Sequence, residues 1–222
     1  SAFCSVVIDI IAENSFCNYA VNPLMNIVTS ALIILGGLGY IVWWDVLRVV
    51  KSRSKKNKKI FRHLTLHSKI AITVTASLIL AGAILIFIFE YANPLTIGEM
   101  NLFDKIQVSF FQSVTTRTAG FASVPQENLT NASAAISLLL MMIGGSPVGT
   151  AGGMKTVTLA VLICSAFATI RNKNSATLFG RRISDDSLKK AVAVVVMFLT
   201  ICATSTVLIL ATSNASAIDA VY

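Results

Sequence analysis

Apolar residues run along the chain in long blocks that short polar or basic stretches separate. Three blocks have the length of one membrane-spanning helix: Leu24 to Val50, Ile70 to Phe89 and Leu188 to Ala211. A helix needs about 20 apolar residues to cross the hydrocarbon core of a bilayer. A fourth block, Asn128 to Arg171, is roughly twice as long as one span. The pattern therefore predicts an all-α integral membrane protein.

Composition supports this class. Hydrophobic residues make up 55% of the chain, charged residues make up 13%, and the mean hydropathy is +0.76. Such values are typical of a membrane protein and exclude a soluble globular domain. The sequence offers no cluster of histidine with carboxylates, no activated serine or cysteine, and no acidic pair within an apolar block. We therefore expect no enzymatic activity and no cofactor.

The positive charges are clustered. The formal net charge is +8, and 15 of the 18 lysine and arginine residues fall in two stretches between apolar blocks. A nucleic-acid partner would need a basic face interleaved with aromatic or base-reading groups, so we expect none. The first stretch contains Arg48, Lys51, Arg53, Lys55, Lys56, Lys58, Lys59, Arg62 and Lys69, and the second contains Arg171, Lys173, Arg181, Arg182, Lys189 and Lys190.

These clusters decide the predicted topology, because cytoplasmic loops carry an excess of lysine and arginine. If the block 128–171 formed two spans, the second basic stretch would lie outside the cell. One span broken in its middle keeps both stretches in the cytoplasm. We therefore expect a multi-pass protein of the plasma membrane, with residues 1–22 outside and Ser187 capping a last outward span.

A short helix precedes the broken span. Asn101 is a good N-cap, and Asp104 lies favourably near the positive end of a helix that runs to about Val114. About 13 residues are too few to cross a bilayer, so the pattern predicts a re-entrant half-helix. Its C-terminal end would carry partial negative charge, directed at residues 115–120.

Two passages rich in glycine and hydroxyl groups interrupt the apolar surroundings, at Ser113–Phe121 and Gly144–Lys155. Non-helical backbone is tolerated in a membrane only where protein buries it or water reaches it. Backbone carbonyls in such loops can replace the hydration shell of an ion. The two breaks together indicate a pathway through the bilayer.

The second passage is also a candidate gate. Residues 144–153 include five glycines and one proline, which a stable helix does not tolerate. A flexible loop below an ion filter could block the path in one state and withdraw in another. Lys155 would either place its charge near the path or extend to the inner interface. The candidate gate residues are Gly144, Gly145, Ser146, Pro147, Gly149, Thr150, Gly152, Gly153 and Lys155.

The order of these elements suggests a repeat of span, half-helix, loop and span, which is complete once. We expect residues 1–50 to end a second repeat, and 51–69 to form a cytoplasmic basic loop. Residues 70–171 would form the complete third repeat. Residues 172–222 would form a cytoplasmic loop and the first span of a fourth, which makes the chain a piece of a longer protein.

At these residues the chain resembles the TrkH/KtrB-type potassium transporters of the Trk/Ktr/HKT superfamily. Ser113–Phe121 resembles the third pore loop of that family, and Gly144–Thr156 resembles the intramembrane loop in the helix that follows. Gly36–Tyr40, followed by Asp45, is similar to the end of the second repeat. The resemblance implies four membrane-pore-membrane repeats around one pore.

The resemblance also implies a potassium site. K⁺ would be held by the backbone of Thr118, Ala119 and Gly120, and glycine permits a backbone geometry that a side chain would hinder. Arg117 must point away from the ion path and find a partner, for which Glu127 is a candidate by proximity in sequence. The proposed third filter loop comprises Thr116, Arg117, Thr118, Ala119, Gly120 and Phe121.

The second filter loop departs from the family pattern. By likeness it comprises Cys4, Ser5, Val6 and Val7, and Val7 stands where a glycine is expected. A β-branched residue fits a left-handed backbone conformation poorly. Either this loop no longer coordinates the ion, or the register is displaced, and the sequence leaves selectivity for K⁺ over Na⁺ open.

The function predicted on this basis is potassium uptake by the pore-forming subunit of a Trk/Ktr-type system. The alternatives are a degenerate or partial fragment that does not conduct, and another cation-coupled secondary transporter with a broken helix. The resemblance implies a homodimer and a cytoplasmic nucleotide-binding regulatory subunit, besides contact with membrane lipid. The sequence does not identify a coupling ion.

Overall fold

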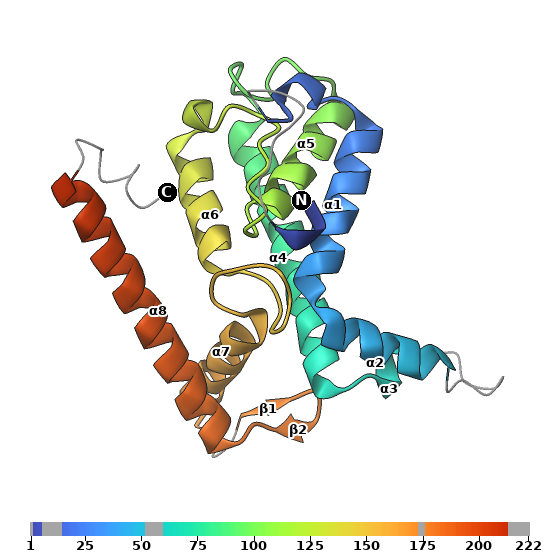
Figure 1. The fold of residues 1–222 in the computed structure, drawn as a ribbon, viewed down its shortest axis with the longest axis vertical. Coiled ribbons are helices and arrows are strands. Elements are labelled where there is room, and N and C mark those ends of the chain that lie inside the picture. The colour runs from blue at the N-terminus through green and yellow to red at the C-terminus, as the bar shows by residue number, and fades with distance from the viewer. Residues whose placement is uncertain (1, 6–14, 52–59, 173–175, 213–222) are drawn as a thin grey trace. The chain divides into compact units, whose positions relative to one another are not determined.

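The structure is a computed structural model in which the chain divides into two compact units, residues 1–156 and 157–222. Each unit is described by itself. The described residues are mainly helical, as the sequence predicts (Figure 1). They are residues 2–5, 15–51, 60–172 and 176–212.

In the first unit α5 packs against both α1 and α4, and α4 also contacts α6 (Figure 1). The elements of this unit are η1 (Ala2–Cys4), η2 (Cys17–Tyr19), α1 (Pro23–Leu38), α2 (Tyr40–Lys51), α3 (Ile60–His63), α4 (Leu66–Glu90), α5 (Leu102–Thr115), η3 (Gln126–Asn128) and α6 (Asn131–Met142).

The second unit contains most of α7 (Thr156–Ile170), a short hairpin of β1 (Thr177–Leu178) and β2 (Arg181–Arg182), and α8 (Asp185–Thr212). The antiparallel hairpin was not predicted. Its turn has positive φ at Phe179 (49°) and Gly180 (77°). Glycine favours this conformation because it has no Cβ.

Two of the described helices, α4 and α8, are long and apolar enough to cross a membrane alone. By contrast α6 has 12 residues and α7 has 15, and the loop 143–155 separates them. Neither reaches the length of about 20 residues that one span needs. Two short helices joined by a long loop are what the prediction of one broken span requires.

Hydroxyl side chains begin the long helices. Thr65 Oγ1 accepts a hydrogen bond from Ser68 N at 3.3 Å, so α4 begins four residues before the predicted Ile70. At the start of α8, Ser184 Oγ accepts from Ser187 N at 3.3 Å. The prediction that Ser187 caps this helix is therefore wrong. A serine or threonine accepts from the residue three positions later, so the cap is the first hydroxyl of the pair.

A buried carboxylate holds each of two helix starts. Asp45 Oδ2 accepts from Thr65 N at 2.7 Å and from Thr65 Oγ1 at 2.9 Å. Glu90 Oε1 accepts from the corresponding atoms of Thr130, at 2.9 Å and 2.7 Å. Both carboxylates are buried, and each also satisfies a backbone N–H at the start of a helix, where no partner within the helix exists. The middle of α2 and the end of α4 are thereby each fixed to the start of another helix.

The first apolar block, Leu24–Val50, does not form one straight span, and that prediction is corrected. Instead α1 and α2 meet at an angle of 91°. Gly39 lies at the bend with φ 78°, which only glycine adopts without strain. A Cβ at this position would lie 2.9 Å from Gly149 N and from Pro147 O, so the loop 143–155 crosses directly over the bend.

The variant Gly39→Ala tests this account of the bend. A side chain here forces both a left-handed backbone and a backbone contact, at a cost of about 1–3 kcal/mol. We expect the apparent melting temperature of the full-length protein to fall by about 2–4 °C for each kcal/mol lost. Gly37→Ala is the matched control, because a Cβ there would have no atom within 4 Å. Equal effects of the two variants would contradict the account.

The half-helix α5 has 14 residues and begins after Asn101, as predicted. Its Phe111 and Val114 are buried in one core with Ile33 of α1 and Ile79 of α4. Ser113 Oγ also donates to Ile79 O at 2.8 Å, which ties the half-helix to the spanning helix. In Figure 1 α5 ends partway along α4, and the loop 143–155 lies beyond that end.

Candidate functional site

The backbone turns back sharply after α5. Ala119 N and Gly120 N both donate to Thr115 O, at 3.0 Å and 3.2 Å, and Thr115 Oγ1 donates to Phe121 O at 2.6 Å. Thr118 and Gly120 have φ of 67° and 78°. One buried threonine therefore fixes the start and the end of the filter loop, which we define as residues 116–121.

The carbonyls of residues 116–120 accept no hydrogen bond from any donor in the part of the chain that the structure describes. Gly120 is exposed, although its neighbours Ala119 and Phe121 are buried. These carbonyls follow the C-terminal end of α5, where the helix dipole is negative. Unpaired carbonyl oxygens at such an end can bind a cation that has lost its water shell.

Arg117 belongs to the filter loop, but its side chain leaves the loop. The side chain is buried, and Nη2 donates to Gly144 O at 2.8 Å. The predicted partner Glu127 is wrong, because that residue is exposed and neither ion pair found among the described residues includes Arg117. Proximity in sequence misled the prediction, because the observed partner lies 27 residues away from Arg117 along the chain.

The intramembrane loop, residues 143–155, is held from two sides. On one side, Ser146 N donates to Gly37 O at 2.8 Å, and Thr150 N donates to Gly36 O at 3.2 Å. These acceptors are carbonyls at the C-terminal end of α1. On the other side, Gly152 N donates to Thr118 Oγ1 of the filter loop at 2.9 Å.

The intramembrane loop also closes on itself. Ile143 and Met154 form a parallel bridge, and Met154 N donates to Met142 O at 2.9 Å. A Cβ on Gly144 would collide with Gly152 O, so the two arms are in backbone contact. Close backbone approach explains the glycines here, since Cβ atoms added at Gly145, Gly149 and Gly153 would also lie within about 3 Å of other atoms.

Two further predicted gate residues are Pro147, near the tip of this loop, and Lys155, at its end. Pro147 is half-buried and the adjacent Val148, with φ 63°, is exposed at the tip. Lys155 is half-buried, and its Nζ donates to Ala151 O at 2.7 Å. The lysine charge is therefore held at the loop itself, beside its own backbone.

The described part of the second filter-like loop contacts the intramembrane loop. Thr150 Oγ1 donates to Phe3 O at 3.0 Å and lies 3.3 Å from Ser5 Oγ. Cys4 between them is exposed. Val6 and Val7, where the departure from the expected glycine falls, lie outside the described residues.

Sequence analysis missed the role of Gly36 and Gly37 as acceptors for the intramembrane loop. Small residues in a membrane helix usually serve close packing against another helix. The Gly-Gly-Leu-Gly pattern was the available signal, because such glycines allow any backbone to approach closely. The pattern within one helix could not show which backbone approaches, because that backbone lies more than 100 residues later in the chain.

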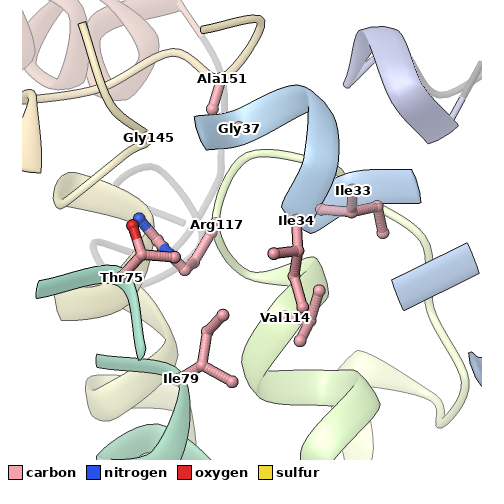
Figure 2. Close-up of a pocket in the computed structure, with 9 residues that line it drawn as sticks. All are labelled: Ile33, Ile34, Gly37, Thr75, Ile79, Val114, Arg117, Gly145 and Ala151. Atoms are coloured by element: carbon pink, nitrogen blue, oxygen red, sulfur yellow. The ribbon is translucent and has the colours of Figure 1, made fainter. Parts of the chain in front are cut away.

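A small cavity of about 10 Å³ lies behind the filter loop. Side chains of α1, α4 and α5 line it together with the intramembrane loop, and Arg117 and Thr75 are its polar members (Figure 2). Figure 2 shows the guanidinium of Arg117 directed toward Thr75 on α4. The other lining side chains are aliphatic, among them Ile79 and Val114.

Comparison with known proteins identifies the family to which this chain is similar. A sequence profile described as TrkH, cation transport protein, matches residues 1–220. The chain is 38% identical over 202 residues to the potassium/sodium uptake protein NtpJ of Enterococcus hirae, covering 91% of the chain and 42% of that protein. It is 36% identical over 186 residues to the Ktr system potassium uptake protein B of Bacillus subtilis, covering 84% and 40%.

The fold agrees with the sequence. The crystal structure of the potassium transporter TrkH from Vibrio parahaemolyticus superposes with a TM-score of 0.80 at 12% identity, covering 99% of this chain and 46% of that one. The chain thus spans less than half the length of the relatives it matches. The resemblance found in the two loop motifs is confirmed, as is the expectation of a transport protein rather than an enzyme. The chain belongs to the TrkH family of cation transport proteins.

Proposed function

We propose that this chain forms part of the pore of a potassium uptake protein, with K⁺ as the transported ion. The main support is the row of unpaired carbonyls at residues 116–120, placed at the negative end of a buried half-helix. Thr118, Ala119 and Gly120 would present these oxygens to the ion. The names of two relatives, a potassium/sodium uptake protein and a Ktr system potassium uptake protein, both include this ion.

We also propose that the intramembrane loop is the gate. It contacts the filter loop through Thr118 and Arg117, and it contacts α1 through Gly36 and Gly37. It also contacts Phe3 and Ser5 near the N-terminus through Thr150. These six partners hold the loop in one defined position, although its backbone cannot form a stable helix. Breaking a few of these bonds would free the loop without unfolding a helix.

We propose that the protein also acts with a regulatory partner. The name "Ktr system" of one relative indicates a protein that acts with other components. A cytoplasmic nucleotide-binding subunit and a homodimer follow from the family resemblance alone. Such a partner would act from the side of the two basic stretches, by moving the intramembrane loop.

Orientation can be tested independently of transport. We predict that both basic stretches are cytoplasmic, because loops with an excess of lysine and arginine stay on the cytoplasmic side of the membrane. In intact cells, cysteines introduced as Lys56→Cys and Arg181→Cys should both resist a membrane-impermeant thiol reagent, and both should react after permeabilisation. Labelling of Arg181→Cys in intact cells would contradict the broken-span topology.

Uptake of radioactive rubidium by the full-length protein in proteoliposomes tests the proposed cargo. We expect rubidium to enter only the vesicles that contain protein, and excess K⁺ to compete better than excess Na⁺. Protein-free vesicles are the control. Uptake at the level of that control, by protein that is folded and inserted, would instead favour a subunit that does not conduct.

A further inference from the structure

The cavity behind the filter loop brings together two buried polar atoms that have no partner among the described residues. These are Arg117 Nε and Thr75 Oγ1. The two residues are only 6% and 4% exposed. A buried hydrogen-bonding group without a partner loses its interaction with water and gains nothing in return, so such groups in folded proteins are almost always satisfied.

The charge of Arg117 strengthens the argument. A guanidinium placed in an apolar surrounding needs compensation, and within the described chain Arg117 forms no ion pair. The C-terminal end of α5 supplies partial negative charge, and Gly144 O occupies Nη2. Nε is buried and has no partner among the described residues, and the Arg117 side chain lines the cavity together with Thr75 (Figure 2).

The size of the cavity selects its occupant. A volume of about 10 Å³ matches the space that one water molecule needs, and a polyatomic anion such as phosphate does not fit. A buried water needs at least two polar partners. Arg117 Nε–H can donate to it, and Thr75 Oγ1 can accept from it or donate to it.

We propose that one ordered water occupies this cavity and joins Arg117 to Thr75, so that α4, the filter loop and the intramembrane loop are linked in one chain of hydrogen bonds. We call this chain the latch: Thr75 Oγ1, water, Arg117 Nε, Arg117 Nη2 and Gly144 O. Thr75 is then a positioning residue. It fixes the guanidinium, which in turn holds the Gly144 end of the loop. The gating consequence rests on the proposed function, but the water and the latch do not.

An experimental density map of the full-length protein, at a resolution that shows ordered water, tests the occupant directly. We expect one density peak within hydrogen-bond distance of both Arg117 Nε and Thr75 Oγ1. A map that resolves both side chains and waters elsewhere in the interior, but has no peak here, would overturn the proposal.

Chemical labelling tests the latch. Ser146 is fully buried, so Ser146→Cys in a cysteine-free background reports on departure of the intramembrane loop. Adding Thr75→Val removes the polar partner at nearly constant volume. We expect the reaction with a membrane-permeant maleimide to be about fivefold faster, the effect of losing one hydrogen bond. Thr75→Ser, which keeps the hydroxyl, should restore the slow reaction.

Thr73→Val is the matched control, because Thr73 lies on the same helix but is exposed. If Thr75→Val and Thr73→Val react at the same rate, or if Thr75→Ser reacts as fast as Thr75→Val, the latch is disproved. Should Thr75→Val fail to fold, the density map still decides. Labelling does not depend on ion movement, so a faster reaction in a protein without rubidium uptake would uphold the latch and contradict only the proposed function.

Discussion

Replacing Gly120 with serine is expected to reduce the preference of the full-length protein for K⁺ over Na⁺ by about tenfold, the equivalent of 1.4 kcal/mol. Gly120 has φ 78°, and an L-residue in this conformation costs about 1–2 kcal/mol. The simplest relief is rotation of the adjacent peptide, which would turn the carbonyl of Ala119 or Gly120 away from the ion. Competition of Na⁺ with rubidium uptake measures the change.

Gly152→Ser is the matched control for this variant. Gly152 is also exposed and lies beside the filter loop, yet a Cβ there would meet only the Thr118 methyl group, at 3.9 Å. We expect its selectivity to stay within about twofold of the unmodified protein, since its backbone carries no strain. Unchanged selectivity in Gly120→Ser would show that Gly120 is not part of the filter.

Local patterns predicted the half-helix well. The short apolar run placed α5 within one residue of its observed end at Thr115, and α5 begins after Asn101 although the Asn101 side chain makes no capping hydrogen bond. Capping and hydrophobic periodicity act over one or two turns, so a single sequence contains the information. The broken span was likewise predictable, because glycine and proline at 144–153 exclude a helix whatever the surroundings.

The bend at Gly39 was not predictable in the same way. Apolar composition continues on both sides of it, and a glycine inside a membrane helix usually means close packing. What turns the chain is the backbone of Pro147 and Gly149 crossing over that position. The only sign of this distant contact in the sequence is the glycine at position 39, which has no side chain to obstruct it.

In the candidate site, too, local features were predictable from the sequence and contacts between distant segments were not. Sequence identified the filter loop and the intramembrane loop as separate unusual passages, and likeness to a family gave each a role. It did not show that Arg117 and Thr118, inside the first passage, bond to Gly144 and Gly152 in the second. Sequence proximity suggested Glu127 as the partner of Arg117, whereas the observed partner is a backbone carbonyl, which no residue type in the sequence reveals.

The intramembrane loop offers the second large effect, an increase of ion flux on its removal. Deleting residues 146–151 eliminates the bonds from Ser146 N and Thr150 N to α1 and the bond from Thr150 Oγ1 to Phe3 O. Each contributes about 1 kcal/mol, so a gate held closed by them should open at least tenfold more often. The two arms that flank the deletion already pack together, since a Cβ on Gly144 would collide with Gly152 O. The shortened chain can therefore reconnect with little distortion.

Rubidium flux through the full-length protein should accordingly rise by about tenfold in the deletion variant, limited by the fully open state. Thr150→Val is the milder companion: it keeps the loop length but removes the bond to Phe3 O, and should raise flux by about threefold to fivefold. Val148→Ala is the control, because this exposed side chain at the tip holds nothing in place. If the deletion variant folds and inserts but its flux is unchanged or lower, the loop is a structural break in the span and not a gate, because its bonds to α1 and to Phe3 have been removed without effect.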